Sequence, residues 1–128
     1  MNDDMEQIEK NYLASWDEIE DMFRHYRQYE AESSRLYFEN LFNDMRKAQY
    51  DRSLRVGTQL GDIVISRSTV EGLTERHSWI RLFITSDKKL QIRSKIAKKT
   101  QEYEFDTIEL NDKLIELLDK LVALPIDG

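Results

Sequence analysis

The side chains that carry out most reactions at neutral pH are scarce in this sequence. Histidine occurs twice, at His25 and His77, and cysteine is absent, which excludes thiol nucleophiles and thiolate ligands. No serine lies in a Gly-x-Ser-x-Gly turn, and neither Gly57 nor Gly61 is followed by the Gly-Lys-Ser/Thr of a phosphate-binding loop. We therefore predict a protein that is not an enzyme and needs no cofactor. A small ribonuclease-like enzyme built around His25 or His77 is the third of three hypotheses.

Metal binding has equally weak support. Asp21 and His25 stand four positions apart, so that on a helix they could supply two ligands to a divalent ion. No third ligand is evident beside them, and no histidine pair or acidic cluster has the spacing of a metal site. The sequence therefore predicts no bound metal.

A basic segment stands out in a chain whose formal net charge is −6. Residues 88–99 hold six cationic side chains and no acidic one, at Lys88, Lys89, Arg93, Lys95, Lys98 and Lys99. A cluster of this kind can hold nucleic-acid phosphates, and nucleic-acid binding through these residues is our second hypothesis. It would also require an unopposed basic face with exposed aromatic rings on which bases stack.

The residues around these cations favour a structural explanation. Leu90, Ile92 and Ile96 alternate with polar and basic residues, as in a strand with one apolar and one basic face. Residues 101–108 alternate in the same way, with acids outward at Glu102, Glu104 and Asp106. If the two strands pair, each opposite-charge pair contributes roughly 0.2–1 kcal/mol and helps to fix the register. We therefore predict that carboxylates within the protein neutralise most of these cations.

The first half of the chain is predicted to be helical over residues 2–52. No glycine or proline occurs from Asn2 to Val56, and apolar residues recur at helical spacing, at Met5, Ile8, Tyr12, Trp16, Ile19, Phe23 and Tyr26. This stripe fails at Glu30, Ser33 and Ser34, and serine favours helix caps over helix interiors. Either the chain reverses near residues 30–34 into a helical hairpin capped by Ser33 or Ser34, or one long helix carries a polar gap. We favour the hairpin.

The outer side of this first helix is strongly acidic. Its acids point away from the apolar stripe, at Asp17, Glu18, Glu20 and Asp21. A solvated face explains them most simply, but such charges can also guide a basic partner, with Trp16 and Tyr29 supplying apolar contact. These six residues are the candidate partner-binding site. The stretch from Ser15 to Glu18 also has the spacing of a capping box, which marks a possible helix start at Ser15.

A small antiparallel sheet is predicted over residues 54–108. Glycines separate short runs of β-branched and aromatic residues, and brief links between the runs require antiparallel neighbours. The expected strands are 54–58, 62–68, 77–86, 88–96 and 101–108. Residues 79–84 are apolar on both faces, so we expect a central strand with both faces buried. One face would contact the N-terminal helix, and the other would contact the C-terminal helix or another subunit.

The C-terminal helix, predicted over residues 111–124, has the clearest signals. Asn111 is a good N-cap, Asp112 suits the positive end of the helix dipole, and Pro125 ends the helix. Its apolar stripe comprises Leu114, Leu117, Leu118, Leu121 and Val122.

Together these elements predict one α+β domain over residues 1–128, with an N-terminal helix or helical hairpin, an antiparallel sheet of 4–5 strands and a C-terminal helix. The acidic N-terminus is unlike a signal peptide and no apolar run reaches the roughly 18 residues of a membrane span, so we expect a cytoplasmic location without membrane contact. Our first hypothesis is a non-catalytic protein-interaction module, namely an adaptor, inhibitor or immunity-type protein. We expect it to bind a protein partner and to self-associate through the aromatic stripe as a homodimer or larger oligomer.

Overall fold

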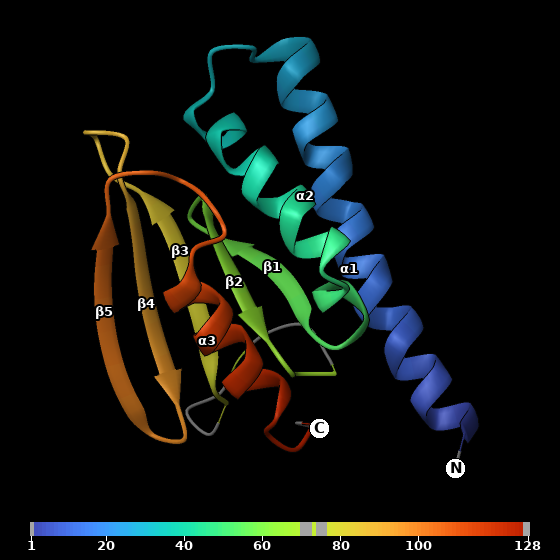
Figure 1. The fold of residues 1–128 in the computed structure, drawn as a ribbon. Coiled ribbons are helices and arrows are strands. Elements are labelled where there is room, and N and C mark those ends of the chain that lie inside the picture. The colour runs from blue at the N-terminus through green and yellow to red at the C-terminus, as the bar shows by residue number, and fades with distance from the viewer. Residues whose placement is uncertain (1, 70–72, 74–76, 127–128) are drawn as a thin grey trace.

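A computed structural model describes residues 2–69, 73 and 77–126 of the chain. Its helical elements are α1 (Asn2–Tyr29), the 3-10 helix η1 (Ser34–Phe38), α2 (Glu39–Lys47), the 3-10 helix η2 (Tyr50–Arg52) and α3 (Asp112–Val122). Its strands are β1 (Arg55–Gln59), β2 (Asp62–Ser66), β3 (Trp79–Ile84), β4 (Leu90–Ile96) and β5 (Lys99–Phe105). The fold is α+β, as the sequence predicts, with a long N-terminal helix, a five-stranded antiparallel sheet and a C-terminal helix (Figure 1).

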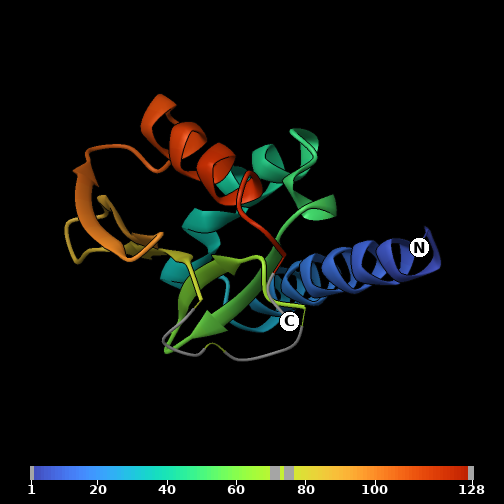
Figure 2. The ribbon, with the colours of Figure 1, turned by 90° about the horizontal axis from the view of Figure 1, so that it is seen from below.

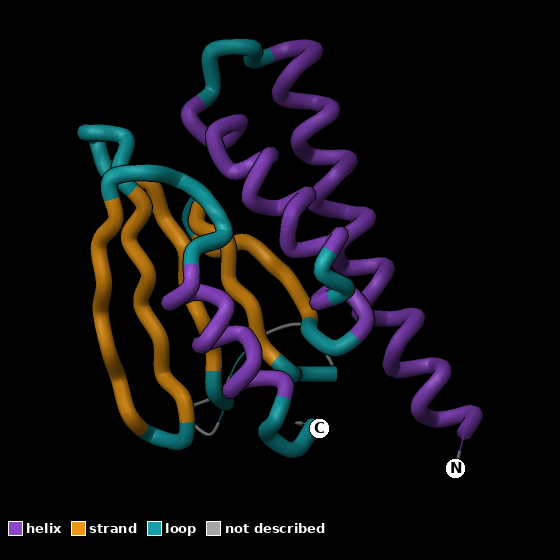
Figure 3. The backbone as a smooth tube through the Cα atoms, in the orientation of Figure 1, coloured by secondary structure: helices purple, strands orange, loops and turns teal. Residues whose placement is uncertain are grey.

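The N-terminal helices form the hairpin that the sequence favours. Helix α1 ends at Tyr29, a loop follows, and α2 runs back beside α1 (Figures 1 and 3). Ser33 is the N-cap of η1, because its side-chain oxygen accepts a hydrogen bond of 3.3 Å from the Arg35 backbone N–H. The break in the apolar stripe therefore marks a real chain reversal.

Arg46 ties the two arms of this hairpin together. Its guanidinium contacts Asp17 and Glu20 of α1, each at 2.8 Å, and Asp51 of η2 at 3.0 Å. Burial acts to lower the pKa of Arg46, but the hydrogen bonds to these three carboxylates outweigh it and raise the pKa above its usual value. The arginine is thus held charged at the point where α1, α2 and η2 meet.

The five strands are paired antiparallel in sequence order, β1-β2-β3-β4-β5. Each observed strand lies within four residues of the expected bounds at either end. A two-residue turn, Leu60-Gly61, joins β1 to β2, and both residues have positive φ angles of 53° and 89°. This combination is a type I′ turn, whose twist matches that of the paired strands.

The hydrophobic core lies on one face of the sheet, here called the inner face. Ile63, Leu82 and Ile92 occupy consecutive positions across three strands and are buried. Both α2 and α3 lie on this side of the sheet (Figure 2), while α1 packs beside α2 and along β1. Trp16 and Phe23 of α1 each contact the Phe42 ring of α2, with centroids 5.0 and 5.3 Å apart.

The prediction that β3 is buried on both faces is wrong. Ile80 and Leu82 on the inner face are fully buried, but Trp79 and Phe83 on the opposite, outer face are only half-buried. Among the described residues no helix covers the outer face, because α2 and α3 both lie on the inner face (Figure 2). The outer face is instead partly polar, since the Arg93 guanidinium lies 5.1 Å from the Phe83 ring centroid.

Helix α3 begins as predicted. The Asn111 side-chain oxygen accepts a hydrogen bond of 2.8 Å from the Leu114 N–H, and the buried residues are Leu114, Leu117, Leu118 and Leu121. The Tyr50 hydroxyl of η2 donates a 2.8 Å hydrogen bond to Asp119 of α3. Burial, followed by this bond to a carboxylate, raises the pKa of Tyr50 to about 12.

Across the described part of the chain, no helix has both the length and the apolar character needed to cross a membrane.

Candidate functional site

Helix α1 closes the first half of the β1 edge. A strand at the edge of a sheet leaves its outward backbone groups unpaired, and β1 pairs only with β2. The Trp16 indole N–H donates to the Leu54 carbonyl at 2.8 Å, and the Ser15 hydroxyl oxygen accepts from the Val56 N–H at 3.1 Å. Two side chains of α1 thus replace the missing neighbouring strand at residues 54–56.

This contact also corrects a prediction about Ser15. The helix does not begin there but continues from Asn2 to Tyr29 through Ser15. The Ser15 hydroxyl donates to the Tyr12 carbonyl of its own helix at 2.6 Å while accepting from Val56. Its role is therefore to bond the edge of the sheet rather than to cap a helix.

The second half of the β1 edge is open. The two-residue turn pairs Gln59 with Asp62, so Gln59 exchanges hydrogen bonds with β2 and the backbone N–H and C=O of Thr58 point away from β2. The backbone N–H of Val56, two residues earlier, points to the same side and donates a hydrogen bond to the Ser15 hydroxyl oxygen. Among the described residues, no hydrogen bond reaches the Thr58 N–H or C=O.

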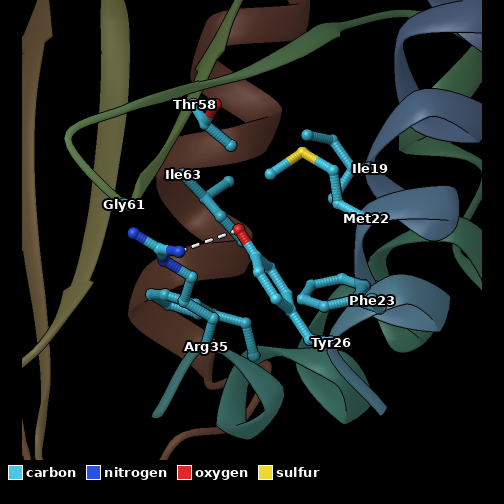
Figure 4. A pocket seen from close by; sticks show the side chains of 9 residues that line it. Ile19, Met22, Phe23, Tyr26, Arg35, Thr58, Gly61 and Ile63 are labelled. Carbon is cyan, nitrogen blue, oxygen red and sulfur yellow. Dashed lines mark hydrogen bonds between the residues drawn. The ribbon is translucent and has the colours of Figure 1, made fainter. Parts of the chain in front are cut away.

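A pocket of about 170 Å³ lies beside this open segment, between α1 and the β1–β2 hairpin. Its walls are mainly apolar (Figure 4), and its lining residues are Ile19, Met22, Phe23, Tyr26, Arg35, Phe38, Thr58, Gly61 and Ile63. A second hollow of about 410 Å³ on the other side of β1 shares Ile19, Met22 and Thr58 with it. We call the combined space the α1–β1 groove.

Arg35 stands at the mouth of the pocket. Its Nη1 donates a 2.9 Å hydrogen bond to the Tyr26 hydroxyl, and its guanidinium carbon lies 5.2 Å from the centroid of the Tyr26 ring (Figure 4). Gly61 makes room for it, because a Cβ at Gly61 would lie 3.2 Å from the Arg35 Nε. Within the described residues, no carboxylate lies within the 4.0 Å of an ion pair with Arg35.

Leu60, which adjoins the groove, is exposed to solvent and has a left-handed backbone conformation. It is 92% exposed and has a φ of 53°, a left-handed conformation that costs a branched side chain roughly 1–2 kcal/mol. With Arg35, Phe38, Asp62 and others it lines a further hollow beside the mouth of the pocket. The chain thus presents an apolar side chain to solvent where folding gains nothing from it.

The six candidate partner-binding residues do not form one surface. Trp16 is fully buried and unavailable to a partner, which corrects its assignment as an apolar contact. Asp17 and Glu20 bind Arg46. Asp21 pairs with Arg24 at 2.7 Å, Glu18 is exposed on the outer side of the α1–β1 groove, and Tyr29 is exposed with its ring 4.9 Å from that of His25.

The prediction of a basic row beside an acidic row is confirmed. Arg93 of β4 pairs with Glu102 of β5 at 3.1 Å, and Lys89 pairs with Asp106 just beyond these strands at 3.6 Å. Gln91 likewise donates to Glu104 at 2.9 Å. The remaining cations of the cluster are Lys88, Lys95, Lys98 and Lys99.

Lys88 lies 5.2 Å from the centroid of the Tyr37 ring, and Lys95 is half-buried on the outer face. Lys98 and Lys99 are exposed where β4 turns into β5, and no ion pair joins them to another described residue. Among the described residues, ion pairs with carboxylates thus involve Lys89 and Arg93, two of the six cations, which is fewer than the sequence predicted, and Lys98 and Lys99 form an exposed basic pair at the β4–β5 turn.

The two histidines are not brought together. His25 is exposed near the end of α1, whereas His77 is buried just before β3, and these segments lie at opposite ends of the molecule (Figure 1). Asp21 is engaged by Arg24, and no group of three or more ligand side chains that could hold a metal occurs among the described residues.

Comparisons of the chain with protein-family models, with curated proteins and with solved structures found no match. The interpretation of the groove therefore rests on its geometry. Sequence reasoning did not find Arg35, Thr58 or Leu60. A two-residue turn between alternating segments is visible at Leu60-Gly61 and could have indicated the hairpin, but no sequence signal shows which edge of it remains open.

Proposed function

We propose that this protein is a non-catalytic protein-interaction module that binds an extended segment of a partner protein in the α1–β1 groove. The observation that carries the proposal is the open backbone of Thr58 beside an apolar pocket. Exposed strand edges bind peptides by adding a strand, in which main-chain hydrogen bonds give affinity and side-chain pockets give specificity.

The groove can supply both parts of that interaction. A bound residue opposite Thr58 can exchange two backbone hydrogen bonds with it, because the Thr58 N–H and C=O point to the same side. The pocket of about 170 Å³ can accept an aliphatic or small aromatic side chain, since a cavity of about 150 Å³ holds benzene. Leu60 extends the apolar surface beyond the pocket.

Helix α1 limits the length of the segment that can pair. Ser15 and Trp16 already occupy the edge at Leu54 and Val56, so an added strand can reach Thr58 only from the turn side. The partner therefore contributes a short extended segment rather than a long strand. Depending on what that segment does in its own protein, the module acts as an adaptor, an inhibitor or an immunity-type protein.

A selection experiment tests this proposal. The immobilised protein is presented with a display library of random decapeptides, beside a Met22→Trp variant whose larger side chain fills the pocket. We expect the wild type to enrich related sequences and the variant to enrich none. Met5→Trp, which enlarges an exposed methionine on α1 outside the groove, is the matched control and should select as the wild type does.

Two outcomes decide the matter, provided that circular dichroism shows all three proteins folded. Enrichment of related peptides by the wild type and by Met5→Trp, but not by Met22→Trp, supports the groove. Equal enrichment by Met22→Trp, or none by the wild type, contradicts it.

Self-association is a second proposal, with a changed surface. The aromatic stripe cannot serve, because Tyr12, Trp16, Ile19 and Phe23 are buried within the chain. The outer face of the sheet offers half-buried Trp79 and Phe83 instead. We expect light scattering to give a dimer that Phe83→Glu dissociates. A monomeric wild type at the highest soluble concentration would reject this proposal.

We also infer a cytoplasmic location, because the chain has no cysteine with which to form the disulfides common in secreted domains of this size.

A further inference from the structure

We propose that the α1–β1 groove selects an acidic segment, in which an aliphatic side chain fills the pocket and an Asp or Glu side chain binds Arg35. This inference rests on the proposed function and names the chemistry of the segment that the groove accepts. It follows from the state of Arg35, from the neighbours that hold it, and from the spacing of side chains in an extended peptide.

Arg35 differs from the other arginines of the described residues. Six of the nine pair with carboxylates, at Arg24, Arg27, Arg46, Arg52, Arg81 and Arg93. Arg55 and Arg67 donate to backbone carbonyls. Arg35 alone of these nine has a neutral hydroxyl, that of Tyr26, as its side-chain hydrogen-bond partner. A guanidinium has five N–H donors, so most of those of Arg35 remain available to a ligand.

The surroundings hold Arg35 in place without neutralising it. The Tyr26 hydroxyl fixes one nitrogen and the Tyr26 ring supports the guanidinium at 5.2 Å. Asp62 lines the adjoining hollow together with Arg35, but its carboxylate is bound by Arg81 at 2.7 Å. A carboxylate from a partner would therefore be the acidic group that Arg35 lacks, and a planar guanidinium suits a carboxylate through paired hydrogen bonds.

The geometry sets the spacing of the two side chains. Arg35 and the apolar residues line the same pocket on the inner side of β1. In an extended peptide, side chains two residues apart point to the same side and are separated by roughly 7 Å. The preferred segment thus carries its aliphatic and acidic side chains two positions apart, and because the Arg35 guanidinium lies beside Gly61 at the turn end of β1, the acid comes last in a segment that runs parallel to β1. Because the protein is acidic overall, this preference depends on Arg35 itself rather than on the net field.

Two matched peptides test the inference: acetyl-Leu-Ser-Asp-amide and acetyl-Leu-Ser-Asn-amide. Each is titrated into the isotope-labelled protein while the backbone amide signals of Thr58 and Gly61 are followed by NMR. We expect the Asp peptide to bind about fivefold more tightly than the Asn peptide, the size expected of a solvent-exposed ion pair. A third peptide, acetyl-Ser-Leu with a free carboxyl end, tests the alternative source of the carboxylate.

Variants separate the role of Arg35 from general charge. Arg35→Gln should remove the preference, so that this variant binds the Asp and Asn peptides with equal affinity, and a double-mutant cycle then gives the coupling between Arg35 and the acidic side chain. Arg24→Gln removes an exposed cation from α1 outside the groove and should keep the fivefold preference.

Each outcome decides. Equal affinities of the Asp and Asn peptides for the wild type would overturn the acidic preference but leave peptide binding intact. If acetyl-Ser-Leu binds more tightly than the Asp peptide, the carboxylate that Arg35 binds is a chain terminus and the proposal of an acidic side chain is wrong. If none of the three peptides shifts the Thr58 signal, the aliphatic-x-acid pattern is wrong, and the proposed function then depends on the library selection alone.

Discussion

Helix α1 meets strand β1 in two different ways along one continuous contact. At Leu54 and Val56 the helix bonds directly to the strand edge through Trp16 and Ser15. At Thr58 the same helix faces the same edge with Met22 across a pocket. Helix α1 therefore closes this strand edge only where its side chains bond to the backbone.

The chemistry of the side chains explains the difference. Serine and tryptophan offer a hydroxyl and an indole N–H, which satisfy outward backbone groups when buried. Methionine makes only apolar contacts and has a weak acceptor, so it leaves the N–H of Thr58 to solvent or to a ligand. Nearly two turns further along α1, at Met22, the helix therefore no longer bonds to the strand edge, and the edge is open.

The largest effect that we expect comes from a substitution at the closed part of the β1 edge, where α1 bonds to Leu54 and Val56. Trp16→Ala removes a fully buried ring from the core and leaves the Leu54 carbonyl without its donor. The free energy of unfolding should fall by about 3–5 kcal/mol, as for other buried aromatic residues. Urea unfolding followed by circular dichroism measures this. A loss below about 1 kcal/mol would mean that Trp16 does not hold α1 against β1.

A smaller loss should follow Ser15→Ala. This change leaves the buried Val56 N–H without a partner, at a cost of about 1–3 kcal/mol, of which the better helix propensity of alanine returns about 0.5 kcal/mol. Thr58→Val is the control in the open half and should change stability by less than about 0.5 kcal/mol. If urea unfolding gives similar losses in the free energy of unfolding for Ser15→Ala and Thr58→Val, the β1 edge does not differ between Val56 and Thr58 as described.

A gain in stability is expected at the turn beside the open half. Leu60→Asn replaces a 92% exposed leucine in the left-handed region by a residue that adopts this conformation more readily. We expect the free energy of unfolding to rise by about 0.5–1 kcal/mol, measured by thermal unfolding. An unchanged or lower melting temperature would show that Leu60 stabilises the fold and is not kept for contact with a partner.

The smallest effect concerns the hydrogen bond from Tyr50 of η2, just before β1, to Asp119 of α3. The pKa of Tyr50 is raised to about 12, so the neutral phenol stabilises the fold fully below about pH 10, and this contribution is lost as the pH rises through about 12. Absorbance at 295 nm should show a late-titrating phenol that Tyr50→Phe lacks. Identical titration curves for the two proteins would mean that Tyr50 has no raised pKa and is not held by Asp119.

The sequence predicted the parts of the fold that local periodicity controls. Alternation located the strands, Asn111 marked the start of α3, and the failure of the apolar stripe near Ser33 marked the hairpin. The basic row of β4 beside the acidic row of β5 also followed from alternation in neighbouring segments, and the Arg93–Glu102 ion pair is part of it.

Features that depend on distant residues were missed. Ser15 resembled a helix cap because its partner, Val56, lies 41 residues away in the sequence. The outer face of β3 was expected to be buried because Trp79 and Phe83 are apolar. The sequence does not show that α2 and α3 both lie on the opposite face. The availability of Arg35 depends on where the other arginines find their carboxylates, which only the folded chain determines.

Hydrogen exchange at two backbone amides tests the central claim most directly. In the free protein the Val56 amide, bonded to Ser15, should exchange slowly, while the Thr58 amide should exchange at nearly the rate of an unprotected group. Adding a peptide selected by the wild type should slow exchange at Thr58 by about tenfold or more and leave Val56 unchanged. Protection of Thr58 in the free protein, or no change on binding, would contradict an open edge that accepts a partner.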